Sequence, residues 1–189
     1  MRFIGQARAR IAEDTLRILR FFRFNAAYGR GAPDPDGLAA CVAARAGLAR
    51  LSAERVRAEI MKLLVAPRAV EMIEALFDHG LLVLLLAAAP RLHGFARLTK
   101  LEPTSPAALR LAVLAVHVAE DVDRLADRLR LSSAERAGLH HAVPPSVRRP
   151  PSEPEQKEQF YRLGRDAYRA RLLIGWARSA APLDDRDWR

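Results

Sequence analysis

Cysteine, aromatic residues and long apolar runs are scarce in this sequence, and each shortage excludes a class of structure. Cys41 is the only cysteine, so an intrachain disulfide and a cysteine-based metal cluster are both excluded. Aromatic residues make up 6% of the 189 residues while Ala and Leu are abundant, which favours helices over sheets. The longest apolar run, residues 81–89, is much shorter than the ~20 residues that a bilayer-spanning helix needs. We therefore expect a cytoplasmic, soluble protein with no membrane partner.

Lysine is also scarce, although the chain is strongly basic. Arginine supplies 28 of the 31 positive charges, and the formal net charge is +9. Such an excess indicates a polyanionic partner, with nucleic acid as the first candidate. An arginine-rich coding bias would raise the charge in the same way, so charge alone leaves both explanations open.

The apolar periodicity is helical throughout the chain. No segment alternates with a period of two residues and no internal repeat is present, so we expect an all-α fold, a multi-helix array. The predicted helices are 13–28, 38–45, one that begins after Ser52 and ends before Pro67, 70–79, 107–118, 121–130, one that begins after Ser132, and one long helix from Ser152 through Trp176, with 81–86 as a short helix or buried connection.

Several local signals mark where these helices begin. Ser52 is a good N-cap, and the pairs Ser132 with Glu135 and Ser152 with Glu155 fit capping boxes. The dipeptide at residues 105–106, a serine before a proline, predicts another helix start. Five prolines between residues 144 and 154 form the best candidate boundary, and the polar end at 182–189 shows no clear terminal element.

The most informative segment is residues 10–24, where acidic and basic residues recur at helical spacing. On a single helix Asp14 and Arg17 are three residues apart, so their side chains would be neighbours. Arg10, Arg20 and Arg23 continue the pattern and would form a curved basic strip beside them.

An aspartate beside an arginine has the hydrogen-bonding pattern needed to select a nucleobase. Ionised Asp14 offers only acceptors, and Arg17 offers a rigid fork of donors. Cytosine and adenine both present an amino group beside an unprotonated ring nitrogen, which matches this pair. Uracil and guanine present a carbonyl beside a ring N–H, and would leave polar groups unpaired. Arg20 and Arg23 could then hold phosphates.

Spacing alone more often reflects a surface salt bridge or a solvated arginine face. The complete pattern is more specific. Glu13-Asp14-x-x-Arg17-x-x-Arg20-x-x-Arg23-Phe24, followed by residues 51–64 (LSAERVRAEIMKLL), resembles the neck motifs of class II CCA-adding tRNA nucleotidyltransferases and bacterial poly(A) polymerases. The resemblance is strongest over residues 7–66, and residues 109–114 and 128–132 are looser matches.

The resemblance implies a domain plan and a set of roles. Residues 1–66 would be a neck-like nucleotide-selecting and RNA-binding domain, 67–143 a helical body, 144–154 a Pro-rich linker and 155–189 a partial tail helix. Asp14 and Arg17 would read the incoming CTP or ATP, and Arg20 and Arg23 would be further nucleotide-binding residues.

Three more arginines are weaker candidates for RNA contact, namely Arg10, Arg55 and Arg57. For Arg55 and Arg57 we favour a helix-stabilising charge network with Glu54 and Glu59.

The catalytic part of that family has no counterpart in this sequence. Its metal-assisted chemistry needs a head domain with paired carboxylates and a Gly-rich loop. Asp34 and Asp36 flank a proline before Gly37 and are interpreted as turn and cap residues, and no histidine has convincing ligand spacing. We therefore expect a fragment, inactive alone, with no catalytic residue or cofactor of its own. Mg²⁺ would be needed only with a head domain, which a separate gene could encode.

Two other functional classes remain open. The chain could be a stand-alone helical RNA-binding module that recognises phosphates and RNA shape. It could also be a protein-interaction scaffold whose charge is incidental. Within the resemblance, CCA addition and poly(A) addition are not separated, and the oligomeric state is undetermined.

Overall fold

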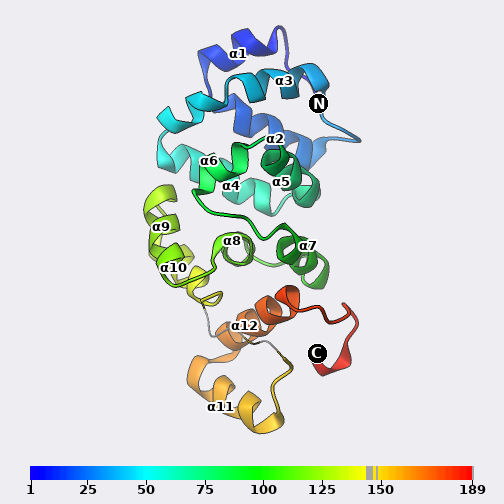
Figure 1. Ribbon diagram of the computed structural model, residues 1–189, viewed down its shortest axis with the longest axis vertical. Coiled ribbons are helices and arrows are strands. Elements are labelled where there is room, and N and C mark those ends of the chain that lie inside the picture. The colour runs from blue at the N-terminus through cyan, green and yellow to red at the C-terminus, as the bar shows by residue number, and fades with distance from the viewer. Residues whose placement is uncertain (144–146, 148, 189) are drawn as a thin grey trace. The chain divides into compact units, whose positions relative to one another are not determined.

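The computed structural model describes residues 1–143, 147 and 149–188, and this part of the chain is helical without a strand. This confirms the all-α prediction. The elements, in chain order, are α1 (Ala7–Glu13), α2 (Arg17–Tyr28), α3 (Pro35–Ala43), the 3₁₀ helix η1 (Arg45–Arg50), α4 (Ala53–Leu64), α5 (Ala69–Asp78), α6 (Leu81–Leu86), α7 (Leu92–Leu101), α8 (Ala107–Ala115), α9 (Glu120–Leu129), α10 (Ser133–His140), α11 (Glu153–Leu163), α12 (Arg165–Arg178) and the 3₁₀ helix η2 (Arg186–Trp188) (Figure 1). Among the described residues, no helix is both long and apolar enough to cross a bilayer.

The described chain forms two compact units. The first unit comprises Met1–Pro90 with Leu125–Leu131, and the second comprises Arg91–Arg124 with Ser132–Arg189, so the division falls within α9. These units are defined by packing within the chain, and their boundaries differ from those of the predicted functional regions. The functional regions 1–66, 67–143, 144–154 and 155–189 stay a prediction. Pro144 and Pro145 of the expected linker lie outside the described residues.

The first unit is organised around α2, which packs against α4 and α5 (Figure 1). Ile18 and Phe22 of α2 are fully buried, as are Leu64 of α4 and Ile73 of α5. These residues recur every three or four positions on their helices, so each helix directs one apolar face inward. The opposite, polar face of α2 is thereby left to carry its arginines.

The second unit is organised around α8. Every residue from Leu111 to Val116 has no exposed surface, which explains the strongly apolar sequence of this segment. Helices α7, α10 and α12 pack around α8, and α11 packs on α12.

The structure confirms four local predictions. The side chain of Ser52 accepts a hydrogen bond from the Arg55 N–H and caps α4. Both capping boxes are present, at Ser132 and at Ser152. Asp34 caps α3 by accepting from the Gly37 N–H, with proline at the first helical position, as the turn-and-cap interpretation requires.

The prediction of one continuous helix over 13–28 was wrong. Helix α1 ends at Glu13 and α2 begins at Arg17, with Asp14 in extended backbone (φ −151°, ψ 104°). The Asp14 carboxylate accepts a hydrogen bond from the Leu16 N–H at 3.1 Å, and such local bonding competes with helix formation. The break also lies where the chain approaches closely, because a Cβ at Gly47 would be 2.9 Å from Cγ2 of Thr15.

Predictions near the C-terminus also need correction. The expected long helix is two helices, α11 and α12, divided by Gly164 at φ 78°, a left-handed region that favours glycine. The C-terminal end has an element that its polar sequence did not indicate, the 3₁₀ helix η2, in which buried Trp188 stacks on Trp176 with ring centroids 6.3 Å apart.

Helix α8 begins at Ala107 as predicted, but the expected capping role of Ser105 was wrong, and helix α7 was missed. Ser105 does not cap α8: it is buried and its hydroxyl accepts from Nε of Arg110 at 3.0 Å, while Pro106 takes the N-cap position. Helix α7 (Leu92–Leu101), with buried Phe95 and Leu98, was not predicted at all.

Candidate functional site

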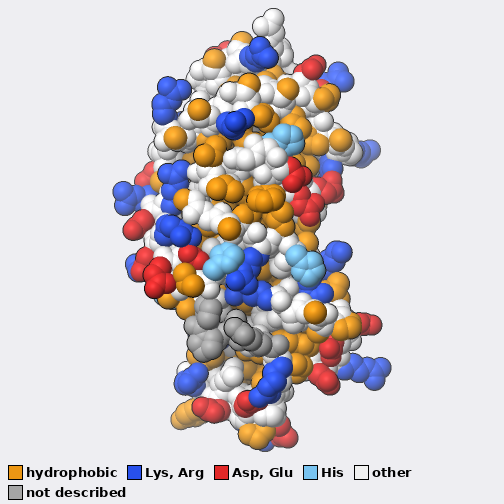
Figure 2. All heavy atoms as spheres, in the orientation of Figure 1, with side chains coloured by type: hydrophobic (Ala, Val, Ile, Leu, Met, Phe, Trp, Pro, Cys, Tyr) orange, Lys and Arg blue, Asp and Glu red, His pale blue; other side chains and the backbone are white. Residues whose placement is uncertain are grey.

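The candidate nucleotide-binding residues lie in the first unit, at the α1–α2 junction and along the polar face of α2. Charge by itself does not single out this region, because Lys and Arg side chains are scattered over the visible face of the molecule (Figure 2). Only the contacts of each side chain distinguish the candidate residues from the other charged residues.

Asp14 is held by groups from two different elements. Nη2 of Arg55 on α4 lies 3.0 Å from both carboxylate oxygens, and the Leu16 N–H donates from the adjacent turn. Nη1 of Arg20 is 3.9 Å from Oδ2. Partial burial would raise the pKa of Asp14, but the Leu16 N–H and the Arg55 guanidinium outweigh it, so the pKa is lowered. The carboxylate is therefore ionised and able to accept hydrogen bonds at neutral pH.

Arg17 does not pair with the Asp14 side chain in this arrangement. Its Nη1 donates to the Arg10 carbonyl oxygen at 2.8 Å and to Glu13 Oε2 at 2.6 Å. The prediction that Asp14 and Arg17 lie on one continuous helix was wrong, because the helix is broken between them. Their role in reading a base stays a prediction.

Arg20 and Arg23 converge on one buried carboxylate, that of Glu59 on α4. Nε of Arg23 lies 2.5 Å from Oε2, and Nε of Arg20 lies 3.5 Å from Oε1. The Arg23 guanidinium also lies 4.1 Å from the centre of the Phe24 ring, within the range of a cation–π contact. Glu59 thus anchors two arginines of α2 to α4.

The three weaker candidates have separate surroundings. Arg10 pairs with Glu13 at 2.8 Å on the exposed side of α1. Arg55 pairs with Asp14, and Nη1 of Arg57 donates to the Arg130 carbonyl oxygen at 3.2 Å. RNA contact by these arginines stays a prediction.

A cavity of about 300 Å³ brings basic and aromatic side chains together in the first unit. Its walls include four arginines and the rings of Phe21 and Phe24; the arginines are Arg2, Arg10, Arg17 and Arg20. Phe3 completes the aromatic side, because it stacks on Phe21 with ring centroids 5.3 Å apart and planes 9° apart. Guanidinium groups beside aromatic faces can bind phosphate and stack a base, which are the two parts of a nucleotide.

Sequence reasoning missed the aromatic side of this cavity and the part played by Glu59. A signal for Glu59 was available: on α4 it lies three residues after Val56 and four before Leu63, so it falls on the apolar arc. A carboxylate in that position needs a cationic partner when it is buried. No comparable signal marked Phe3, because the chain before α1 has no regular periodicity.

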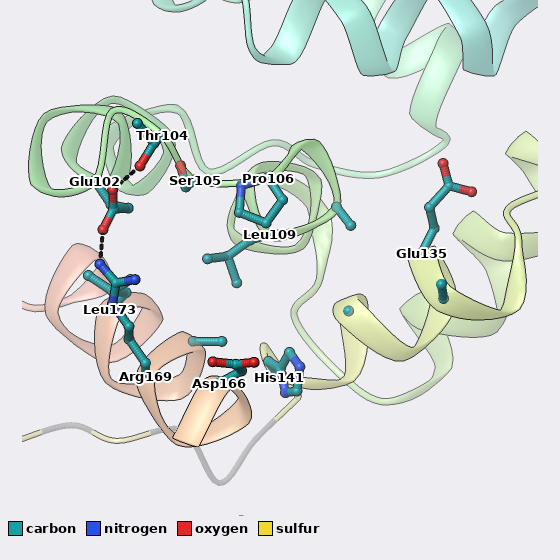
Figure 3. A pocket seen from close by; sticks show the side chains of 14 residues that line it. Glu102, Thr104, Ser105, Pro106, Leu109, Glu135, His141, Asp166, Arg169 and Leu173 are labelled. Carbon is teal, nitrogen blue, oxygen red and sulfur yellow. Dashed lines mark hydrogen bonds and ion pairs between the residues drawn. The ribbon is translucent and has the colours of Figure 1, made fainter. Parts of the chain in front are cut away.

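A larger cavity, of about 490 Å³, lies within the second unit and has a different character. Leu109 and Leu173 contribute apolar walls, and the carboxyl groups of Glu102, Glu135 and Asp166 lie around it (Figure 3). Glu102 is paired with Arg169 and accepts from the Thr104 hydroxyl, as the dashed lines show. Because carboxylates repel phosphates, we do not assign nucleotide binding to this cavity.

Comparisons with known proteins agree with the first unit as the informative region. Residues 32–93 match a family model described as "Probable RNA and SrmB- binding site of polymerase A". The chain is 36% identical over 143 residues to CCA tRNA nucleotidyltransferase 1, mitochondrial, of Mus musculus and of Homo sapiens, which is 72% of this chain and 32% of each relative. The protein of the same name from Danio rerio is 43% identical over 86 residues, 43% of this chain and 19% of the relative.

The chain therefore carries a body region of the CCA-adding tRNA nucleotidyltransferase and poly(A) polymerase family. It spans about a third of the length of its mouse and human relatives. The family model covers Arg55, Arg57 and Glu59 but begins after Asp14 and the arginines of α2. The names of these relatives place them in mitochondria, so the expected cytoplasmic location stays a prediction.

An enzyme of this family is expected to use a metal ion, but the part of the chain that the structure describes has no set of side chains suited to bind one. No group of three or more His, Cys, Asp or Glu side chains there could hold a metal ion. Asp14 and Glu59 are each already paired with arginine. We derive no step through Mg²⁺ from these residues.

Proposed function

We propose that this chain binds tRNA and selects CTP and ATP, as the neck-and-body part of an enzyme that extends RNA 3′ ends. The observation that carries the proposal is the cavity lined by Arg10, Arg17 and Arg20 and by the rings of Phe21 and Phe24, with the Asp14 carboxylate 3.9 Å from Arg20. The names of the relatives support the same function, and the description of the matching family model supports its RNA-binding part.

The parts of the nucleotide would be divided between two kinds of side chain. The triphosphate would pair with the guanidinium groups, since arginine binds phosphate bidentately. The base would lie against an aromatic ring with its polar edge towards Asp14 and Arg17. An acceptor beside a donor pairs with cytosine or adenine and leaves uracil or guanine with unmatched groups.

Nucleotide selectivity is the direct test of this proposal. The full chain is titrated with CTP, ATP, UTP and GTP, and we expect tighter binding of CTP and ATP. Arg17→Gln should reduce that preference, whereas Arg8→Gln removes the same charge from an exposed position of α1 and should preserve it. Equal affinity for the four nucleotides, or no binding of any, would contradict nucleotide selection.

Transfer of a nucleotide would need the catalytic head as a second partner. We expect labelled CTP or ATP to be incorporated into tRNA that lacks its 3′ CCA only when a head domain of this family is added to the chain. Incorporation by the chain alone would overturn the expected dependence on a separate head.

RNA binding without nucleotide selection is the second candidate, and the description of the family model favours it specifically. Its signature would be a tRNA affinity that falls steeply with salt, because each phosphate contact releases counterions. If that dependence is found while the four nucleotides bind alike, the chain is an RNA-binding module alone. If no RNA binds at low salt, both candidates fail.

A further inference from the structure

Both side chains that would read the base are already occupied by partners within the chain. Asp14 receives Arg55 of α4, with Nη2 3.0 Å from each carboxylate oxygen. Arg17 donates to Glu13 at 2.6 Å and to the Arg10 carbonyl oxygen at 2.8 Å. A base that needs the same acceptor and the same donors must compete with these groups.

We propose that Arg55 is an internal competitor of the nucleotide, a latch that occupies Asp14 until the exocyclic amino group of cytosine or adenine displaces it. The inference deepens the proposed function and rests on it. Asp14 remains fixed when Arg55 leaves, because the Leu16 N–H holds Oδ1 from within the α1–α2 turn. When Arg55 leaves, the Asp14 carboxylate is therefore exposed to the base without changing its position.

The two ends of this ion pair are suited to exchange. The side chain of Arg55 is 48% exposed and that of Asp14 is 25% exposed, so water and ligand can reach the pair. Arg55 is also the mobile end, because a long arginine side chain has many rotamers while the Asp14 carboxylate is anchored to its own turn. By contrast, Arg23 lies 2.5 Å from the buried carboxylate of Glu59 and is not expected to exchange.

Charge and competition predict opposite effects for loss of Arg55, which makes the test decisive. Removing a positive charge weakens triphosphate binding, whereas removing a competitor tightens it. Arg55→Gln should therefore bind CTP and ATP about two- to fivefold more tightly, the size that an exposed ion pair contributes. UTP and GTP, whose bases present a carbonyl beside a ring N–H, should bind no more tightly than to the wild-type chain.

The experiment is a titration of the full chain and its variants with the four nucleotides. Arg8→Gln is the matched control for charge. It should bind each of the four nucleotides as tightly as the wild-type chain does, or slightly more weakly. Arg55→Lys keeps the charge but loses the guanidinium fork, so it should shift CTP and ATP affinity in the same direction by less. This second variant keeps the test available if Arg55→Gln does not fold.

Three outcomes separate the latch from the proposed function. Tighter CTP and ATP binding in both Arg55 variants supports the latch. Unchanged or weaker CTP and ATP binding, in a wild-type chain that does prefer them, overturns the latch and makes Arg55 a positioning residue for Asp14. A wild-type chain with no preference among the nucleotides overturns the proposed selection, and the latch with it.

The ion pair itself can be tested without any nucleotide. The carboxyl group of Asp14, followed by NMR through an acid titration, should have a higher pKa in Arg55→Gln than in the wild-type chain, because an opposite charge has been removed. An unchanged pKa for Asp14 would mean that Arg55 does not occupy it in solution, and would overturn the latch.

Discussion

Two half-exposed arginines of the first unit and two buried or partly buried arginines of the second have different kinds of partners. In the first unit, Arg20 and Arg55 pair with carboxylates that come from another part of the chain. In the second, Arg178 donates to the carbonyl oxygens of Val116 at 2.7 Å and Ala142 at 2.8 Å, and Arg110 is 4% exposed and donates to the Pro103 carbonyl oxygen.

This difference separates arginines that can serve a ligand from arginines that maintain the fold. A guanidinium paired with a carboxylate on a partly exposed face can exchange it for a phosphate, because both anions present two oxygens. A guanidinium that satisfies buried carbonyl groups cannot leave without exposing them to an apolar interior. Burial, with the nearby charge of Arg91, lowers the pKa of Arg178 to about 10, which is still far above neutral pH. Arginines of these two kinds therefore have different functions.

The largest effect that this comparison predicts is for Arg178. Arg178→Met should reduce the free energy of unfolding by about 3 kcal/mol, because three backbone carbonyl oxygens lose a charged donor. Urea denaturation measures this change. Arg162→Met, at an exposed position of α11, is the control and should change it by less than about 0.5 kcal/mol. Equal effects of the two variants would mean that burial does not distinguish these arginines.

The next largest effect is for Glu59, where the first unit has its most buried ion pair. Glu59→Gln should cost about 2 kcal/mol of unfolding free energy, because Arg20 and Arg23 lose their shared negative partner. It should also move both arginines, which a nucleotide titration would detect. Glu54→Gln, an exposed residue one turn earlier on α4, should change stability by only a few tenths of a kcal/mol. A Glu59 variant as stable as this control would refute the anchoring role.

A smaller effect is expected at Asp121, where a charge stabilises the second unit. Its Oδ2 accepts from the N–H groups of His117 at 2.6 Å and Val118 at 3.1 Å, and Asp121→Asn should cost about 1 kcal/mol at neutral pH. Burial would raise the pKa of Asp121, but these N–H groups and Arg124 outweigh it, so the pKa is lowered.

The lowered pKa of Asp121 fixes the direction of its pH dependence. Its stabilisation is fully present above the unfolded-state pKa of about 3.9 and is lost as the pH falls through the lower folded-state value. The wild-type chain should therefore lose more stability between pH 5 and pH 2 than Asp121→Asn does. Parallel stability curves for the two proteins in acid urea titrations would contradict this account.

The smallest effect is expected for the exposed pair between Lys157 and Glu153 on α11. These atoms lie 2.7 Å apart, but both side chains are more than three-quarters exposed. Lys157→Ala should change the free energy of unfolding by less than about 0.5 kcal/mol, as measured by thermal or urea unfolding. A loss above about 1 kcal/mol would show that exposed ion pairs also stabilise this fold, and would contradict the distinction between exposed and buried charges.

Much of the fold was predictable because its signals are local. The capping boxes at Ser132 and Ser152 and the cap at Ser52 depend on residues within one turn, and all three were found correctly. The break at Asp14 was not predicted, since its Arg55 partner is 41 residues away in sequence and a helical pattern continues through the break.

The candidate site was only partly predictable for the same reason. The arginines of α2 were found from their spacing, while Glu59 and the rings of Phe3 and Phe21 became part of the site only through packing. Arg17, Arg20, Phe21 and Phe24 all lie on α2, but Phe3 precedes α1 and Glu59 lies on α4, so the periodicity of α2 alone could not reveal the whole site.

By itself, the sequence determined that the chain is helical, that it is basic through arginine, and that a row of these arginines follows two adjacent acidic residues near the N-terminus. Only the tertiary structure decided which carboxylate each arginine meets, and therefore which arginines remain accessible to a ligand. Side-chain identity and spacing act within a few residues, whereas the partner of a buried or half-buried charge is chosen when distant helices pack together.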